Sequence, residues 1–402
     1  MAVPIYMSTA YEFRDSEHAA NLFALKELGN IYTRLMNPTS AVFEKRFASM
    51  EGGVAAIATA SGMAAIFNCI ANLCEAGDNI LVASQVYGGT STLTTHTIKR
   101  FGITSKTFDV TNPSKLEDLI DEKTKMILFE SLTNPNLSVA DFETITKIAD
   151  KHNIITVVDN TVATPILCKP IEYGADVVVH STSKYTTGQG LALGGIIVDS
   201  AKSGTKIIGN SRYAHFNEPD ASYHGLIYAS LPFPPFILRI LLCLQRDLGA
   251  APSPFNSWLF IQGLETLSLR MAKHSSNALT IAKFLESHPK VSKVNYPGLE
   301  SDSNYIRAQK YLQNGSSGLL SFEVDGLDKA KKVVDNVEIF SIVVNIGDSK
   351  SIITHPASTT HQQMNKDELS ACGINEGLIR LSVGLESSED LINDLKKALD
   401  AI

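Results

Sequence analysis

The chain has 402 residues, of which 44% are hydrophobic and 19% are charged, and its formal net charge at pH 7 is −7. This balance is typical of a globular protein and allows a sizeable core and two or three domains. Because the charge is acidic and no dense Lys/Arg cluster occurs, a nucleic-acid partner is excluded.

Other sequence features concern the compartment. The N-terminus lacks the basic flank and long apolar core of a signal peptide. The most apolar later stretch, residues 236–244, is too short for a membrane span and contains Arg239. The five cysteines are scattered without a C-x-x-C pair, which argues against a disulfide framework and a zinc site. We therefore expect a cytoplasmic protein with no membrane and no metal partner.

The first forty residues predict an extended arm followed by a helix over 16–25. Tyr32 and Arg34 share one face if their segment is extended, and Asn37-Pro38 ends it. Thr39 or Ser40 is then expected to cap a helix over 41–50. Arginine and tyrosine could together contact an anion; the alternative is an exposed loop with an incidental arginine.

An apolar run over 54–60 leads into Ser61-Gly62-Met63 and a helical pattern. Such a turn directs backbone N–H groups into the space above a helix N-terminus, where a phosphate can bind. The same sequence is about equally compatible with a purely structural turn that binds no ligand.

From residue 79 onward, strand-like and helical patterns alternate. Strands are expected over 79–83, 125–129, 154–158, 177–179 and 196–198. This alternation predicts a mostly parallel sheet with helices on both faces, whose ligands bind beyond the carboxyl ends of the strands. The residues that directly follow these strands include Tyr87, Asn134, Asp159, Ser181, Ser183 and Lys184.

The stretch His180-Ser-Thr-Ser-Lys184 and the upstream Asp159 meet the requirements of a pyridoxal phosphate (PLP) site. A lysine amine can form a Schiff base with the PLP aldehyde, and hydroxyl groups can bind the phosphate. An aspartate can keep the pyridine nitrogen protonated. By itself the pattern is weak, because lysines follow serines in many surface loops.

The alternation of strands and helices ends near residue 200. Residues 200–256 are interpreted as an insertion or lid-like segment. A long helical pattern from 258 to 287 leads into a smaller α+β domain, with strands expected over 318–324, 339–344 and 379–383 and helices over 327–336 and 388–401. The expected division is 1–45 (a shortened arm), 46–256 (the large PLP-binding domain) and 257–402. Arg380 is either a surface residue or a clamp for a substrate carboxylate. His355 and His361 are more typical of hydrogen-bonding residues than of metal ligands.

Taken together, these motifs resemble the PLP-dependent transsulfuration family. The matching segments lie in family order over nearly the whole chain: Tyr32–Thr39, Ser61–Met63, Val86–Thr90, Asn134–Pro135, Val158–Asn160, Ser181–Tyr185, His355–Ser358 and Arg380–Glu386. The resemblance implies the aspartate aminotransferase-like (type I) fold of PLP-dependent transferases, PLP as cofactor, and a homotetramer built as a dimer of dimers.

The resemblance also implies a role for each matching residue. Lys184 would be the Schiff-base lysine and proton shuttle, Asp159 the partner of the pyridine nitrogen, and Tyr87 the ring-stacking residue. Arg380 would bind the substrate α-carboxylate, and Asn134 would contact the ring hydroxyl side of the cofactor. Four residues of the same subunit would bind the phosphate: Gly62, Met63, Ser181 and Ser183. Tyr32 and Arg34 would bind the phosphate of the neighbouring subunit's cofactor.

Within the family, three features resemble the O-acetylhomoserine sulfhydrylase branch: the segment Asn345-x-Gly-Asp-x-Lys350, the stretch Gln189–Gly195 and the insertion over 200–256. Gly89 stands where methionine γ-lyases commonly have cysteine. The expected reaction is replacement of the acetyl group of O-acetyl-L-homoserine by sulfur from sulfide, a thiol or a carrier protein, with Asn345 near the substrate. A methionine or cystathionine γ-lyase and a cystathionine γ-synthase are the alternatives within the family. A non-catalytic scaffold is the alternative outside it.

Overall fold

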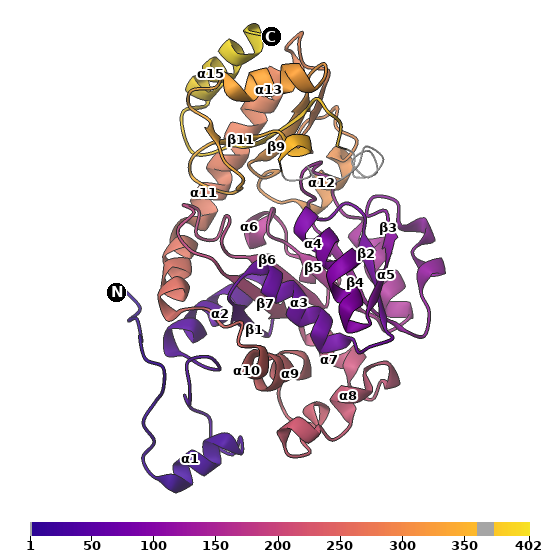
Figure 1. Ribbon diagram of the computed structural model, residues 1–402, viewed down its shortest axis with the longest axis vertical. Helices are drawn as coiled ribbons and strands as arrows, with labels where there is room; N and C mark the ends of the chain where they lie inside the picture. The colour runs from indigo at the N-terminus through magenta and orange to yellow at the C-terminus, as the bar shows by residue number, and fades with distance from the viewer. Residues whose placement is uncertain (1, 360–373) are drawn as a thin grey trace.

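A seven-stranded sheet forms the centre of the larger part of the protein (Figure 1), in a computed structural model that describes residues 2–359 and 374–402. The strands in chain order are β1 (Ala55–Thr59), β2 (Asn79–Ala83), β3 (Thr104–Phe108), β4 (Thr124–Glu130), β5 (Ile155–Asp159), β6 (Val177–Ser181) and β7 (Gly195–Asp199). Their order in the sheet is β1-β7-β6-β5-β4-β2-β3. Only β7 runs antiparallel to its neighbours, β6 and β1. The expected mostly parallel α/β sheet is confirmed; β3 was missed because its sequence, TSKTF, is largely polar.

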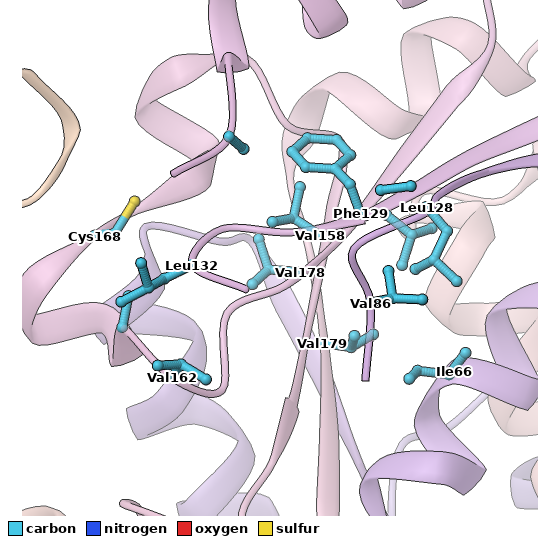
Figure 2. Packing of buried hydrophobic residues seen from close by; sticks show 14 of the residues in the cluster. Ile66, Val86, Leu128, Phe129, Leu132, Val158, Val162, Cys168, Val178 and Val179 are labelled. Atoms are coloured by element: carbon cyan, nitrogen blue, oxygen red, sulfur yellow. The ribbon is translucent and has the colours of Figure 1, made fainter. Parts of the chain in front are cut away.

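The central strands are apolar because helices cover both faces of the sheet. Phe129, Val158 and Val178, from the neighbouring strands β4, β5 and β6, are fully buried. Figure 2 shows these side chains together with Val86 and Ile66, which approach from the flanking segments. This core holds the carboxyl ends of the three strands in fixed positions.

Helices α2 (Pro38–Glu51) and α3 (Gly62–Leu73) lie on opposite faces of the sheet. His180 Nε2 lies 2.5 Å from Glu51 Oε1 of α2, whereas a Cβ on Gly62 of α3 would lie 2.7 Å from the Cβ of Ser181. Because consecutive strand residues point to opposite faces, α3 faces the ligand side and α2 the other side. The shorter helices of this part are α4 (Gly88–Thr92), α5 (Phe142–Lys151) and α6 (Thr164–Leu167).

The N-terminal region differs from two expectations. Asn37, not Thr39 or Ser40, caps α2, since its side chain accepts the N–H groups of both residues. Tyr32 forms one isolated bridge with Ala10, and a turn follows it instead of an extended segment. The arm, which includes α1 (Ser16–Phe23), extends away from the body of the protein (Figure 1).

The segment over 200–256 is not a lid. It contains α7 (Ala201–Ile207), α8 (Ala214–Asn217), α9 (Pro235–Arg239), a π-helical turn (Ile240–Gln245) and α10 (Arg246–Leu248). Helices α8, α9 and α10 lie beneath the large sheet in Figure 1, on the side away from the smaller domain. Phe236 and Ile240 are fully buried. The buried apolar residues of this segment therefore belong to the core.

Helix α11 (Pro254–Glu286) connects the large sheet to a second sheet (Figure 1). That sheet has the order β10-β11-β12-β9-β8 and consists of β8 (Lys293–Asn295), β9 (Leu319–Glu323), β10 (Ser341–Ile342), β11 (Ile352–Thr354) and β12 (Leu378–Ser382). Its helices are α12 (Tyr305–Tyr311), α13 (Leu327–Asp335) and α15 (Ser388–Asp400). The α+β character is confirmed, but only two residues of the strand expected over 339–344 are paired. Within residues 2–359 and 374–402, no helix combines the length and apolar character of a membrane span.

Candidate active site

A cavity of about 260 Å³ lies where the carboxyl ends of β4, β5 and β6 meet the N-terminus of α3 and two segments of the second sheet domain. Ten of the twelve residues predicted as site residues line it: Gly62, Met63, Tyr87, Asn134, Asp159, Ser181, Ser183, Lys184, Asn345 and Arg380. The fold therefore brings together residues as far apart in the sequence as Gly62 and Arg380.

Lys184 lies in the turn that follows β6. Its backbone N–H donates to the carbonyl of Ser181 at 3.2 Å, which fixes the turn. Its amine donates to Oδ1 of Asn345 at 2.7 Å. Burial, and secondly the positive charge of Arg380, lower the pKa of Lys184. A lysine with a lowered pKa supplies more of the neutral amine, which is the form that reacts with an aldehyde or accepts a proton.

Asp159 is the last residue of β5 and has one oxygen free for a ligand. Thr161 donates to Oδ1 from its N–H at 3.0 Å and from its hydroxyl at 2.5 Å. No donor among the described residues reaches Oδ2, and the side chain borders the cavity. Burial raises the pKa of Asp159, and the bonds from Thr161 oppose that shift. A cationic ring nitrogen in the cavity would favour the ionised carboxylate further.

The first turn of α3 supplies two unused backbone donors. Ser61 caps the helix by accepting the N–H of Ala64 at 3.1 Å, and the N–H groups of Gly62 and Met63 have no acceptor among the described residues. The missing side chain of Gly62 allows the close approach of Ser181. These donors form a site for an anion.

Ser183, which is expected to bind the phosphate, makes two hydrogen bonds to the backbone of Gly194. Its hydroxyl accepts the N–H of Gly194 at 2.9 Å and donates to the carbonyl of the same residue at 3.2 Å. It therefore ties the Lys184 turn to the start of β7, although it also borders the cavity. Ser181, whose hydroxyl makes no described hydrogen bond, is the better phosphate ligand of the two.

Arg380 of β12 is buried to 4% exposure and points into the cavity from the smaller domain. Nη1 donates to Oδ1 of Asn134 at 3.1 Å, and Nη2 donates to the carbonyl of Asn345 at 3.3 Å. Burial lowers its pKa to about 10, so it is cationic at neutral pH. Nε has no partner among the described residues. The guanidinium is thus a buried charge with no carboxylate partner among the described residues, and it is available to an anionic ligand.

Tyr87 precedes α4, and its side chain is 46% exposed at the cavity. The ring lies over Gly89, since a Cβ at that position would be 2.6 Å from Cε1 of Tyr87. Any other residue at position 89 would displace the ring. Gly89 thus sets the orientation of an aromatic wall of the cavity.

Tyr32 and Arg34 are the two predicted residues that do not reach this cavity. Both lie exposed on the N-terminal arm, with the Arg34 guanidinium carbon 5.1 Å from the centre of the Tyr32 ring. A single chain therefore leaves them without a role in its own site. Their contribution to a neighbouring subunit remains a prediction.

Sequence reasoning missed two residues of the site. Glu130, the last residue of β4, borders the cavity, and Thr161 orients Asp159. Glu130 lies in register with Asp159 on the adjacent strand. An acidic residue at the end of a buried strand was a visible signal, the same one that identified Asp159.

The histidine expected to have a hydrogen-bonding role has one. His355 Nδ1 lies 2.8 Å from the hydroxyl of Ser358, and Nε2 lies 2.8 Å from the carbonyl of Glu376. His361 lies outside the described residues. In the parts of the chain that the structure describes, no three His, Cys, Asp or Glu side chains are grouped as a metal site requires.

The residues present fit PLP. The cavity combines a lysine amine, a carboxylate oxygen and two N–H groups that have no partner among the described residues, a glycine that leaves room for Ser181, and an aromatic ring. These are the groups that an aldehyde, a protonated pyridine, a phosphate and a flat ring require.

Comparisons with known proteins agree with this donor set. The family model described as Cys/Met metabolism PLP-dependent enzyme matches residues 1–400. O-acetyl-L-homoserine sulfhydrylase of Leptospira meyeri is 47% identical, over 100% of this chain and 92% of its own length.

Two solved structures are also similar. A Campylobacter jejuni protein assigned as an O-acetylhomoserine (thiol)-lyase has a TM-score of 0.98 and is 50% identical over 99% of this chain and 95% of its own; it contains N′-pyridoxyl-lysine-5′-monophosphate. Cystathionine γ-synthase of Xanthomonas oryzae has a TM-score of 0.85 and is 32% identical over 99% of this chain and 92% of its own. The chain belongs to the Cys/Met metabolism PLP-dependent enzyme family, and its cofactor is pyridoxal 5′-phosphate.

Proposed function

We propose that the protein replaces the acetyl group of O-acetyl-L-homoserine by a sulfur nucleophile and releases homocysteine and acetate. The observation that carries the proposal is the convergence of Lys184, Asp159 and Arg380 on one cavity. The choice of substrate is supported by the relatives named O-acetyl-L-homoserine sulfhydrylase, which are 41–47% identical over the full chain.

Five groups would hold the cofactor. The phosphate would bind the N–H groups of Gly62 and Met63 and the hydroxyl of Ser181, and the ring nitrogen would bind Oδ2 of Asp159. Tyr87 would lie against the ring. When bound, PLP supplies an aldehyde that binds the substrate amine and a protonated ring that withdraws electrons from the α-carbon.

Arg380 would bind the substrate α-carboxylate. Its side chain is cationic, buried and held by Asn134 and Asn345. A forked guanidinium binds both oxygens of a carboxylate at once and so fixes the orientation of the α-carbon.

Lys184 would move the protons. Its amine has a lowered pKa and would remove the α-proton and then a proton from the β-carbon. The bond from the γ-carbon to the acetate oxygen breaks with its electron pair, and the sulfur nucleophile forms a bond to the same γ-carbon. The protons then return in the reverse order. Asn345 Oδ1, 2.7 Å from the amine, would hold the lysine between these steps.

The rival reactions of the family are γ-elimination and cystathionine synthesis, which would use the same cofactor residues. The likeness to cystathionine γ-synthase of Xanthomonas oryzae, at 32% identity, is lower than that to the sulfhydrylases. Gly89 and the Asn345 segment also favour γ-replacement by sulfide or a thiol. A carrier protein remains a third source of the sulfur.

A product assay tests the proposal. The purified holoenzyme is supplied with O-acetyl- or O-succinyl-homoserine and with sulfide, methanethiol, cysteine or no donor. We expect homocysteine and acetate from O-acetylhomoserine and sulfide, and loss of nearly all turnover in Lys184→Ala. If 2-oxobutyrate is the main product even when sulfide is present, the protein is a γ-lyase and the proposal is wrong.

We further propose that the protein acts in the cytoplasm as a homotetramer, a dimer of dimers in which Tyr32 and Arg34 of one subunit reach the phosphate of another. The exposure of both side chains on a projecting arm supports this arrangement.

A further inference from the structure

Glu130 is a buried carboxylate at the edge of the cavity that the proposed chemistry does not use. It is 4% exposed, and it lies beside Asp159 at the ends of two adjacent parallel strands. Two carboxylates at neighbouring strand ends repel each other, so each needs its own compensation. Asp159 is compensated by Thr161 and keeps one oxygen open.

The oxygens of Glu130 are instead occupied by backbone donors. Oε1 accepts the N–H of Tyr87 at 2.6 Å, and Oε2 accepts the N–H of Asn134 at 3.2 Å. These two residues belong to different loops, one after β2 and the other after β4. One carboxylate therefore connects two loops across the cavity wall.

Both loops carry groups that the proposed reaction needs. Tyr87 contributes the aromatic wall, and its ring already lies over Gly89. Asn134 supports Arg380 through Oδ1 at 3.1 Å. A shift of either backbone would move the ring or the guanidinium.

We propose that Glu130 is a positioning residue whose carboxylate clamps the backbones of Tyr87 and Asn134 together, and so sets both the stacking tyrosine and the arginine that binds the substrate carboxylate. The clamp does not transfer protons, because each oxygen is committed to an N–H group. The kinetic part of this inference rests on the proposed function, but the structural part does not.

Burial, and secondly the charge of Asp159, raise the pKa of Glu130 well above its usual range, and the two N–H bonds oppose that shift. A carboxyl group that gains a proton still has acceptor capacity, so the two N–H bonds do not require the ionised form.

The test compares Glu130→Gln and Glu130→Leu with Glu44→Gln as a matched control. Glu44 is a partly buried carboxylate that accepts one backbone N–H, from Ala58 at 2.9 Å, but it does not line the cavity. Glutamine at 130 keeps one acceptor oxygen, and leucine keeps none. The proposal therefore predicts that hydrogen exchange and kinetics change most in Glu130→Leu, less in Glu130→Gln and not at all in Glu44→Gln.

The first readout is amide hydrogen exchange of the holoenzyme. We expect exchange at Tyr87 and Asn134 to rise about tenfold or more in Glu130→Leu and to rise less in Glu130→Gln, and we expect exchange within β4 to stay unchanged. Equal exchange in all variants and wild type overturns the clamp. So does an increase spread over the whole protein, because that would indicate only a loss of global stability.

The second readout is steady-state kinetics with the amino-acid substrate. We expect KM to rise about tenfold in Glu130→Leu, because Arg380 loses its support, and kcat to fall as well, because Tyr87 is displaced. Glu130→Gln should be intermediate and Glu44→Gln unchanged. Wild-type kinetics in Glu130→Leu overturn the proposal. If local exchange rises while no substrate of the proposed class is turned over, the clamp stands and the proposed function fails.

Discussion

Arg380→Lys and Arg380→Ala test the proposal that Arg380 binds the α-carboxylate of the substrate. Lysine keeps the positive charge but loses the fork, and alanine removes both. A hydrogen bond to a charged group contributes roughly 1.5–3 kcal/mol, and a forked contact has two. Since about 1.4 kcal/mol corresponds to a factor of ten, we expect kcat/KM to fall about 10- to 100-fold in Arg380→Lys and about 10²- to 10⁴-fold in Arg380→Ala.

The assay compares O-acetyl-L-homoserine with an analogue that has the amine and ester but no carboxylate. The wild-type enzyme should strongly prefer the complete substrate. In Arg380→Ala this preference should collapse, because the variant loses only what the carboxylate contributes. The yellow colour of the bound cofactor should remain, since Arg380 is not assigned to the cofactor.

Arg307→Lys is the matched control. Arg307 also donates to two carbonyl groups, those of Val139 at 3.1 Å and Thr111 at 3.0 Å, but it does not line the cavity. It should leave the preference intact. If Arg380→Ala still distinguishes the two substrates as well as the wild type does, Arg380 does not bind the carboxylate and the reasoning is refuted.

Three further predictions follow from the same geometry. The Arg34→Ala and Lys184→Ala variants should each be inactive alone but should regain about a quarter of wild-type activity when their subunits are mixed in equal amounts and reassembled. The reason is that about half of the dimers are then hybrids, and each hybrid has one intact site; no recovery would mean that Arg34 does not act across subunits. Gly62→Ala should weaken PLP binding about tenfold or more in an absorbance titration, because the new Cβ would lie 2.7 Å from a facing side-chain carbon, whereas Gly204→Ala, whose nearest neighbour would be at 3.7 Å, should bind normally. Burial and the charge of Arg380 lower the pKa of Lys184, so the rate of PLP rebinding to the apoprotein should rise with pH and level off below the ordinary lysine pKa of about 10.4. Removing that charge in Arg380→Ala should move the midpoint to higher pH, and an unmoved midpoint would contradict the assignment.

Much of the ligand side of the site could be predicted from the sequence, because the carboxyl ends of parallel strands converge at one edge of a sheet. Asp159 and Ser181 end strands with strong apolar signals and Lys184 follows one of them, so their positions were clear. Position alone did not separate two serines with different partners: Ser183 binds the backbone of Gly194, while the hydroxyl of Ser181 has no hydrogen-bond partner among the described residues.

The parts that could not be predicted depend on contacts between distant segments. The bond from Lys184 to Asn345 joins residues 161 positions apart, and the clamp formed by Glu130 accepts from the backbone, which has no signature in the sequence. The segment over 200–256 was interpreted as an insertion or lid-like segment, yet Phe236 and Ile240 of this segment are fully buried. Short strands with polar or brief sequences, such as β3 and β8, were also missed.

Mapping the cofactor attachment is the most direct test of the central claim that this cavity is the PLP site. The purified holoenzyme is reduced with borohydride, digested and examined by mass spectrometry for the phosphopyridoxyl group. We expect the group on the peptide that contains Lys184, and no labelled peptide from the Lys184→Ala variant. Attachment at any other lysine, or equal labelling of the variant, would contradict the assignment.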